Sequence, residues 1–105
     1  MSLLSISKAA KLNRTLKTFG VREMKSRWGS CSLDGRMSLS WRLVFAPMDA
    51  IDYVISHEIA HLVHDDHGAK FWQLCEELST NYSTGKNWRR RNGVNLGRYG
   101  KSLLE

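Results

Sequence analysis

The spacing of three histidines constrains the fold of this chain of 105 residues more than any other feature. His57 and His61 are four positions apart, so on a helix they lie on one face, about one turn from each other. His67 comes six positions later, and a continuous helix would carry it too far along the axis to join them. The Asp and Gly residues within 65–68 permit a turn. The sequence therefore predicts a helix, a sharp turn and three imidazoles that meet.

Three imidazoles that meet at one point suit a zinc ion. Zn²⁺ accepts imidazole nitrogen, and a catalytic zinc has three protein ligands with one position left for water. Glu58 directly follows His57, and in the helical pattern His-Glu-x-x-His this glutamate can act as a general base beside the open position. We therefore predict zinc on His57, His61 and His67, and hydrolysis of peptide bonds by zinc-activated water with Glu58 as the base.

Two further residues are alternatives as metal ligands. The distance from His57 to His67 along the chain matches the first-to-last ligand spacing of the metzincin motif, in which a glycine stands where this chain has His64. We expect His64 to be a loop residue or a hydrogen-bond partner near the site. Cys31 is a rival third ligand, because thiolate binds zinc well. The segment 29–31 would then resemble the cysteine segment of peptide deformylases, and the enzyme would be a deformylase-like amidohydrolase.

Other side chains could support the reaction. A hydrogen-bond donor should stabilise the oxyanion that develops during hydrolysis, and carboxylates often orient metal-binding histidines. The candidate donors are Tyr53, Tyr82, Tyr99 and the cluster Arg89–Arg91, and the sequence does not choose among them. The candidate carboxylates are Asp49, Asp52, Asp65 and Asp66, for each of which capping or solvent exposure is the more common role.

The pattern of apolar residues predicts an α+β domain. Apolar residues at helical spacing over 3–16, followed by Gly20, predict a first helix that ends before this glycine. Residues 21–32 are typical of extended chain, Asp34-Gly35 favours a hairpin turn, and alternation over 37–42 predicts a strand. The two strands form an antiparallel hairpin, and residues 43–45 are expected to continue the second one.

The second half of the chain is predicted to be helical. Pro47 suits a helix start, and an apolar stripe from Ile51 to Leu62 predicts the helix that carries His57 and His61. A second helix is expected over about 69–78, and one short helix near Trp88. We therefore predict one domain, residues 1–105, in which a small antiparallel sheet packs on the histidine helix and the helix that follows.

Charge is distributed unevenly. Residues 1–48 carry nine Lys or Arg and two acidic residues, residues 49–80 carry one and seven, and residues 81–105 carry six and one. The basic ends could attract DNA, and Trp88 beside Arg89–Arg91 could stack on bases. An alternative function is therefore a nucleic-acid-binding module with a structural metal. A structural zinc, however, needs four ligands and has no use for Glu58.

The expected compartment is the cytoplasm. No apolar run approaches the roughly 20 residues that span a membrane, and the first residues lack the pattern of a signal peptide. Cys31 and Cys75 are too few for a disulfide framework. We expect a protein or peptide substrate and no membrane partner, while the oligomeric state stays open.

Four separated segments resemble the YgjP-like metallopeptidase domain, which is similar to the SprT-like and WLM zincin proteases. They are Arg27-Trp28-Gly29-Ser30-Cys31-Ser32, Trp41-Arg42-Leu43 before Ala46-Pro47, residues 52–62 and His67-Gly68-Ala69-Lys70-Phe71-Trp72. The resemblance covers about residues 21 to 90. It implies a small zincin-like (minigluzincin) fold, zinc on His57, His61 and His67, and Glu58 as catalytic base. It also implies proteolysis of DNA-bound proteins as one role.

The segment Arg27–Cys31 has no derived catalytic role. Its place in the sequence suggests a strand beside the metal helix, whose edge could pair with an extended substrate. The alternative is that Trp28 belongs to the core and that Arg27 is a surface or ion-paired residue.

Overall fold

Helices and a small mixed sheet make up the part of the chain that the structure describes, residues 1–24 and 27–97 of a computed structural model. In chain order the elements are α1 (Ser2–Lys11), β1 (Thr18–Arg22), β2 (Gly29–Cys31), β3 (Arg36–Ser40), the 3-10 helix η1 (Trp41–Phe45), α2 (Met48–Ala60), α3 (Ala69–Leu78) and α4 (Tyr82–Gly97). None of the helices in this described part has both the length and the apolar character that crossing a bilayer requires.

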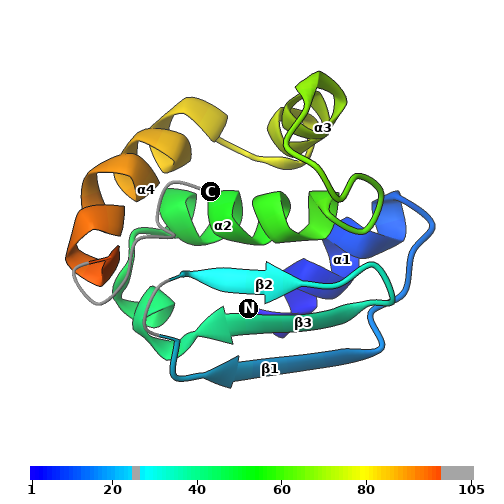
Figure 1. The fold of residues 1–105 in the computed structure, drawn as a ribbon, viewed down its shortest axis with the longest axis horizontal. Coiled ribbons are helices and arrows are strands. Elements are labelled where there is room, and N and C mark those ends of the chain that lie inside the picture. Colours follow the sequence, from blue (N-terminus) through cyan, green and yellow to red (C-terminus); the bar gives the residue numbers. More distant parts are fainter. Residues whose placement is uncertain (25–26, 98–105) are drawn as a thin grey trace.

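Helix α2 runs through the middle of the molecule (Figure 1). The sheet lies along one side of α2, α3 and α4 lie along the other, and α1 passes behind the strands. Ten of the 13 residues of α2 are buried, among them Ile55 and Ile59, and its N-terminal end follows Pro47. A helix covered on nearly every side belongs to the core. The packing around α2 therefore fixes the positions of its polar residues.

The sheet contains the predicted hairpin and one strand in an unexpected direction. β2 is antiparallel to β3, and the turn between them uses Gly35 with a φ of 94°, a conformation that glycine adopts readily. β1 pairs with the other edge of β3 and is parallel to it, so the sheet is mixed, whereas the sequence predicted an antiparallel one. Alternation of apolar residues indicates which face is buried, but it carries no information on strand direction.

The first helix is shorter than predicted. α1 ends at Lys11, and Asn13 adopts a φ of 57°, in the left-handed region that asparagine tolerates better than most residues. Gly20, which was expected to lie beyond the helix as its breaker, lies inside β1. The apolar residues after position 11 therefore belong to the connection into the sheet.

The predicted continuation of the hairpin strand is wrong, because residues 41–45 form η1. The Ser40 hydroxyl accepts a hydrogen bond from the Arg42 backbone amide at 3.2 Å, which stabilises the start of this helical turn.

The prediction for α3 matches the structure, but α4 is much longer than the short helix expected near Trp88. α4 packs closely on α2. A Cβ added at Gly85 would lie 2.3 Å from the Tyr53 Cβ, so only glycine permits this approach. The packing of α2 against the first turns of α4 thus fixes where α4 begins on the molecule.

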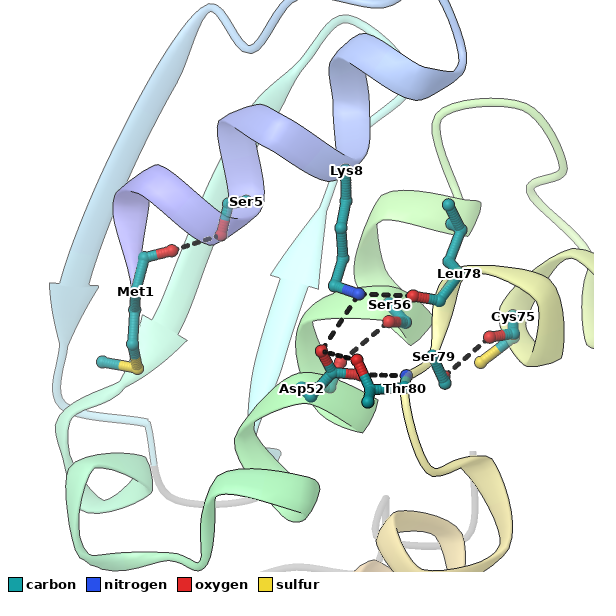
Figure 2. A network of polar contacts seen from close by, with 9 residues as sticks. All are labelled: Met1, Ser5, Lys8, Asp52, Ser56, Cys75, Leu78, Ser79 and Thr80. Atoms are coloured by element: carbon teal, nitrogen blue, oxygen red, sulfur yellow. Dashed lines mark hydrogen bonds and ion pairs between the residues drawn. The ribbon is translucent and has the colours of Figure 1, made fainter.

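A buried polar network joins α1, α2 and the chain after α3 (Figure 2). Lys8, which is 3% exposed, forms an ion pair with Asp52 at 3.1 Å and donates a hydrogen bond to the Leu78 carbonyl. Asp52 also accepts hydrogen bonds from the Thr80 backbone amide at 2.7 Å and the Thr80 hydroxyl at 3.2 Å. The network thus fixes where the chain leaves α3 relative to α2.

Lys8→Met should lower the free energy of unfolding by about 3 kcal/mol, because it leaves the Asp52 carboxylate buried without its cation. Urea denaturation measures the change. Lys11→Met is the matched control, since Lys11 is exposed one turn later on α1 and its replacement should change stability by less than about 0.5 kcal/mol. Equal stability of both variants would show that the ion pair contributes nothing to the fold.

Candidate metal centre

Three imidazoles converge at the C-terminal end of α2. His57 lies in the last turns of α2, His61 is its C-cap residue, and His67 comes from the loop before α3. One ligand atom from each ring lies within 4.8 Å of the others, and the ring centroids are 4.9 to 5.5 Å apart. As predicted, the chain turns after α2 and returns His67 to the two helical histidines. Within the described residues, these three histidines are the group whose ligand atoms lie close enough together to hold one metal ion.

His57 is the buried member of the group. It is 1% exposed, and neither of its ring nitrogens has a hydrogen-bond partner among the described residues. Burial lowers the pKa of His57 to about 2, and the nearby charges of Arg89, His61 and His67 act in the same direction. The ring is therefore neutral at physiological pH. Buried polar atoms are rarely left unpaired, and a metal ion would take the lone pair of one of these two nitrogens.

His61 is oriented by the backbone. Its Nδ1 lies 3.0 Å from the His64 carbonyl oxygen. A carbonyl can only accept, so Nδ1 carries the proton and Nε2 keeps the lone pair that a metal ion needs. His64 is thus a hydrogen-bond partner near the site, as expected, but through its backbone rather than its side chain.

Aromatic side chains of α3 pack against the histidines. Phe71 is fully buried and stacks on His61, with ring centroids 4.5 Å apart. It also meets the rings of His57 and His67 edge-on at 5.0 and 4.9 Å. Trp72 lies 5.5 Å from His57 and 5.8 Å from His67. The sequence marked both residues only as apolar positions of a helix, whereas the structure shows that they hold the imidazoles in place.

Glu58 lies where α2 approaches β2. The residue is 4% exposed, and a Cβ added at Gly29 would be 3.1 Å from its Cγ and 2.9 Å from Leu39 Cδ2. Any larger residue at Gly29 would push on the Glu58 side chain or the core. The end of the segment Arg27–Cys31 is therefore a strand beside the metal helix, β2, and Trp28 just before it belongs to the core, where its ring lies 5.3 Å from that of Trp88.

A cleft of about 630 Å³ opens beside Glu58 and His61. Its other lining residues come from the strands, the hairpin turn and the loop after α2: Arg22, Arg27, Ser30, Cys31, Ser32, Leu33, Arg36, Ser38 and Asp65. The histidine group and the carboxylate therefore lie at a surface that a polypeptide can reach.

The family model of the YgjP-like metallopeptidase domain matches residues 4–92. The chain belongs to the YgjP-like metallopeptidase family. It is accordingly a metallopeptidase, which acts on peptide or protein substrates and depends on a catalytic metal, and the three histidines could bind one. The match begins earlier than the resemblance noted from residue 21, so α1 is part of the family domain.

This YgjP-like fold is also found in the crystal structure of the metallopeptidase zymogen of Pyrococcus abyssi abylysin. The two chains superpose with a TM-score of 0.72 at 20% sequence identity, over 94% of this chain and 97% of that one. The likeness confirms the predicted small α+β fold. No curated protein matches the chain.

Cys31 lies in the cleft of this YgjP-like protein but outside the histidine group. Burial raises the pKa of Cys31 to about 12, and the charges of Glu58 and Asp34 add to the effect. Without a bound metal, the side chain is therefore a thiol near neutral pH. The position of Cys31 outside the histidine group weighs against it as the third ligand.

Three of the four aspartates proposed as partners of the histidines have other contacts in this domain. Asp52 belongs to the Lys8 network, and Asp49 accepts a hydrogen bond from Asn81 at 3.3 Å. Asp66 accepts one from the Gly68 amide at 3.2 Å, at the start of α3, while Asp65 lines the cleft.

The candidate oxyanion donors lie at different distances from the metal centre of this metallopeptidase. The Tyr53 ring is buried 6.0 Å from that of His57, and Tyr82 packs on Tyr53 at 5.7 Å. Arg89 is half-buried, and its charge lowers the pKa of His57. Tyr99 lies outside the described residues. Arg89 is thus the member of its cluster that acts electrostatically on the histidine group.

Proposed function

We propose that this YgjP-like protein is a zinc metallopeptidase in which His57, His61 and His67 hold the ion and Glu58 is the general base. The observation that carries the proposal is that three ligand atoms lie within 4.8 Å of one another. The Glu58 side chain, which follows His57 on the same helix, lines the adjacent cleft. Three imidazoles with one position left open are the donor set of a catalytic zinc.

The residues of the chain then have distinct tasks. Bound zinc would supply Lewis-acid chemistry, since it polarises a carbonyl and lowers the pKa of water. Glu58 takes a proton from the attacking water and delivers it to the leaving amine. Gly29 has no side chain, so the Glu58 side chain can pack directly against β2. The His64 carbonyl holds His61 in the tautomer whose Nε2 can bind metal.

The sheet supports an extended substrate. The strand order β1-β3-β2 places β2 at an edge of the sheet, and Gly29 of β2 adjoins Glu58. An edge strand offers backbone hydrogen bonds to an added peptide strand. A peptide bound there would pass the carboxylate that acts on it.

The alternatives receive less support. A structural zinc has four ligands, whereas three candidate ligands converge within residues 1–24 and 27–97. A deformylase-like enzyme would need Cys31 as a metal ligand, and Cys31 lies outside the converging group of histidines. Proteolysis of DNA-bound proteins stays a prediction. It rests on the basic residues near the two ends of the chain, such as Arg90, which is exposed on α4.

Removal and return of the metal tests the proposal. Treatment with a zinc chelator should lower peptide hydrolysis more than about a hundredfold, and about one equivalent of Zn²⁺ should restore it. Mg²⁺ should not restore it, because this ion prefers oxygen ligands to imidazole. Circular dichroism checks that the fold persists. Full activity in the metal-free protein, or recovery with Mg²⁺ alone, would exclude zinc as the catalytic ion.

A further inference from the structure

We propose that the cleft beside Glu58 binds acidic segments of the polypeptide substrate through Arg22, Arg27 and Arg36. The inference rests on the proposed function in taking the occupant of the cleft to be substrate polypeptide. The cleft is continuous with the site, because Glu58 and His61 form part of its lining.

The cleft reaches round the edge strand β2, from the core side, where Glu58 lies, to the opposite face of the sheet. Met37 and Leu39 are buried in the core, so Arg36 and Ser38, which alternate with them along β3, point to the opposite face. Ser30 is paired with Ser38 and lies on that same face. The short side chains of Ser30 and Ser38 leave space above the strands, and Arg36 lies at the N-terminal end of β3 beside them.

The other two arginines come from the neighbouring strand and loop. Arg22 at the end of β1 is paired with Ser40, so it shares the face of Ser38, and Arg27 precedes β2. Both are exposed, and neither forms an ion pair with another described residue. Cations from three separate segments therefore surround one cleft.

Arg36 keeps binding capacity although it has a partner. Its Nε lies 3.0 Å from Asp34, in an exposed ion pair. A guanidinium has five N–H donors, so one carboxylate contact leaves others available. The planar guanidinium fork matches a carboxylate in geometry. Apart from Glu58, the acidic residue in the lining is Asp65, so cations outnumber acids around the space.

The position of Glu58 favours a peptide over a nucleic acid. A nucleic-acid strand carries a phosphate at every nucleotide, and these charges would be repelled by Glu58 and Asp65. In an acidic peptide the carboxylates are on side chains and the backbone amides are neutral. A neutral amide can therefore lie at Glu58 while the carboxylates reach the arginines. The chemistry of the cleft therefore fits a polypeptide with acidic side chains near the bond that is cut.

Binding to the zinc-loaded Glu58→Gln protein tests this without turnover. Fluorescence anisotropy compares a peptide of about ten residues carrying several glutamates with its glutamine counterpart, both amidated at the C-terminus. The acidic peptide should bind about tenfold more tightly at low salt, because each exposed contact adds a few-fold. At about 500 mM salt the difference should shrink to about twofold. A third peptide, neutral with a free C-terminus, shows whether a terminal carboxylate is bound in the same way.

Matched arginine variants locate the effect. Arg22→Gln with Arg36→Gln should reduce the preference to less than about twofold. Arg90→Gln with Arg91→Gln removes the same charge from exposed positions on α4 and should keep the preference. Equal binding of the two peptides, or an equal loss in the α4 variant, overturns the inference. So does an oligonucleotide that needs Arg22 and Arg36 while the acidic peptide does not. Cleavage of the peptides by the Glu58→Gln protein, seen as a fall in anisotropy with time, would contradict Glu58 as catalytic base but leave the initial binding readable, so the two proposals fail separately.

Discussion

Glu58→Gln is expected to lower kcat for peptide hydrolysis by about a thousandfold while about one zinc per chain stays bound. Glutamine has nearly the same shape as glutamate but cannot take a proton from water, and general-base catalysis contributes roughly a hundredfold to ten-thousandfold. Glu58 is not one of the three converging ligand side chains, so the metal affinity should hardly change. A quenched fluorescent peptide reports the rate, and elemental analysis reports the zinc content.

Glu77→Gln is the control for this variant. Glu77 is exposed on α3 and outside the cleft, so the same chemical change there should leave turnover within about twofold of wild type. If Glu58→Gln hydrolyses the peptide as fast as wild type, the assignment of Glu58 as general base is wrong. If it loses its zinc, the side chain supports the metal and its role has to be reconsidered.

His67→Ala should weaken zinc binding by more than about a hundredfold and abolish hydrolysis with it. Loss of an outer partner of a metal ligand already costs up to about a hundredfold, and loss of a ligand should cost more. His67 is exposed in the loop before α3, so its truncation leaves no cavity in the core and the fold should persist. Titration of zinc against a chelating dye measures the affinity, and thermal unfolding checks the fold.

His64→Ala and Cys31→Ala are the controls for the ligand assignment. His64 contacts His61 through its backbone carbonyl, which alanine retains. Cys31 lies outside the histidine group. Both variants should therefore bind zinc within about tenfold of wild type. Should His67→Ala keep its zinc while one of these variants loses it, the third ligand is the residue that was removed there.

Local sequence determined much of the site. The four-residue interval between His57 and His61 places both rings on one helix face, and the turn residues at 65–68 allow His67 to return to them. The hairpin at Asp34-Gly35 and the extent of α3 also follow from the local pattern. These features depend on neighbours within a few positions, where helical and strand periodicity act directly.

Only the tertiary structure decided the remainder. It paired β1 in parallel with β3, packed α4 on α2 at Gly85, and assigned Asp52 to Lys8 instead of to a histidine. It also placed Gly29 against Glu58 and gathered arginines from separate segments round one cleft. Periodicity states which face of an element is buried, but the partner that covers the face depends on which edges and surfaces the rest of the chain leaves open.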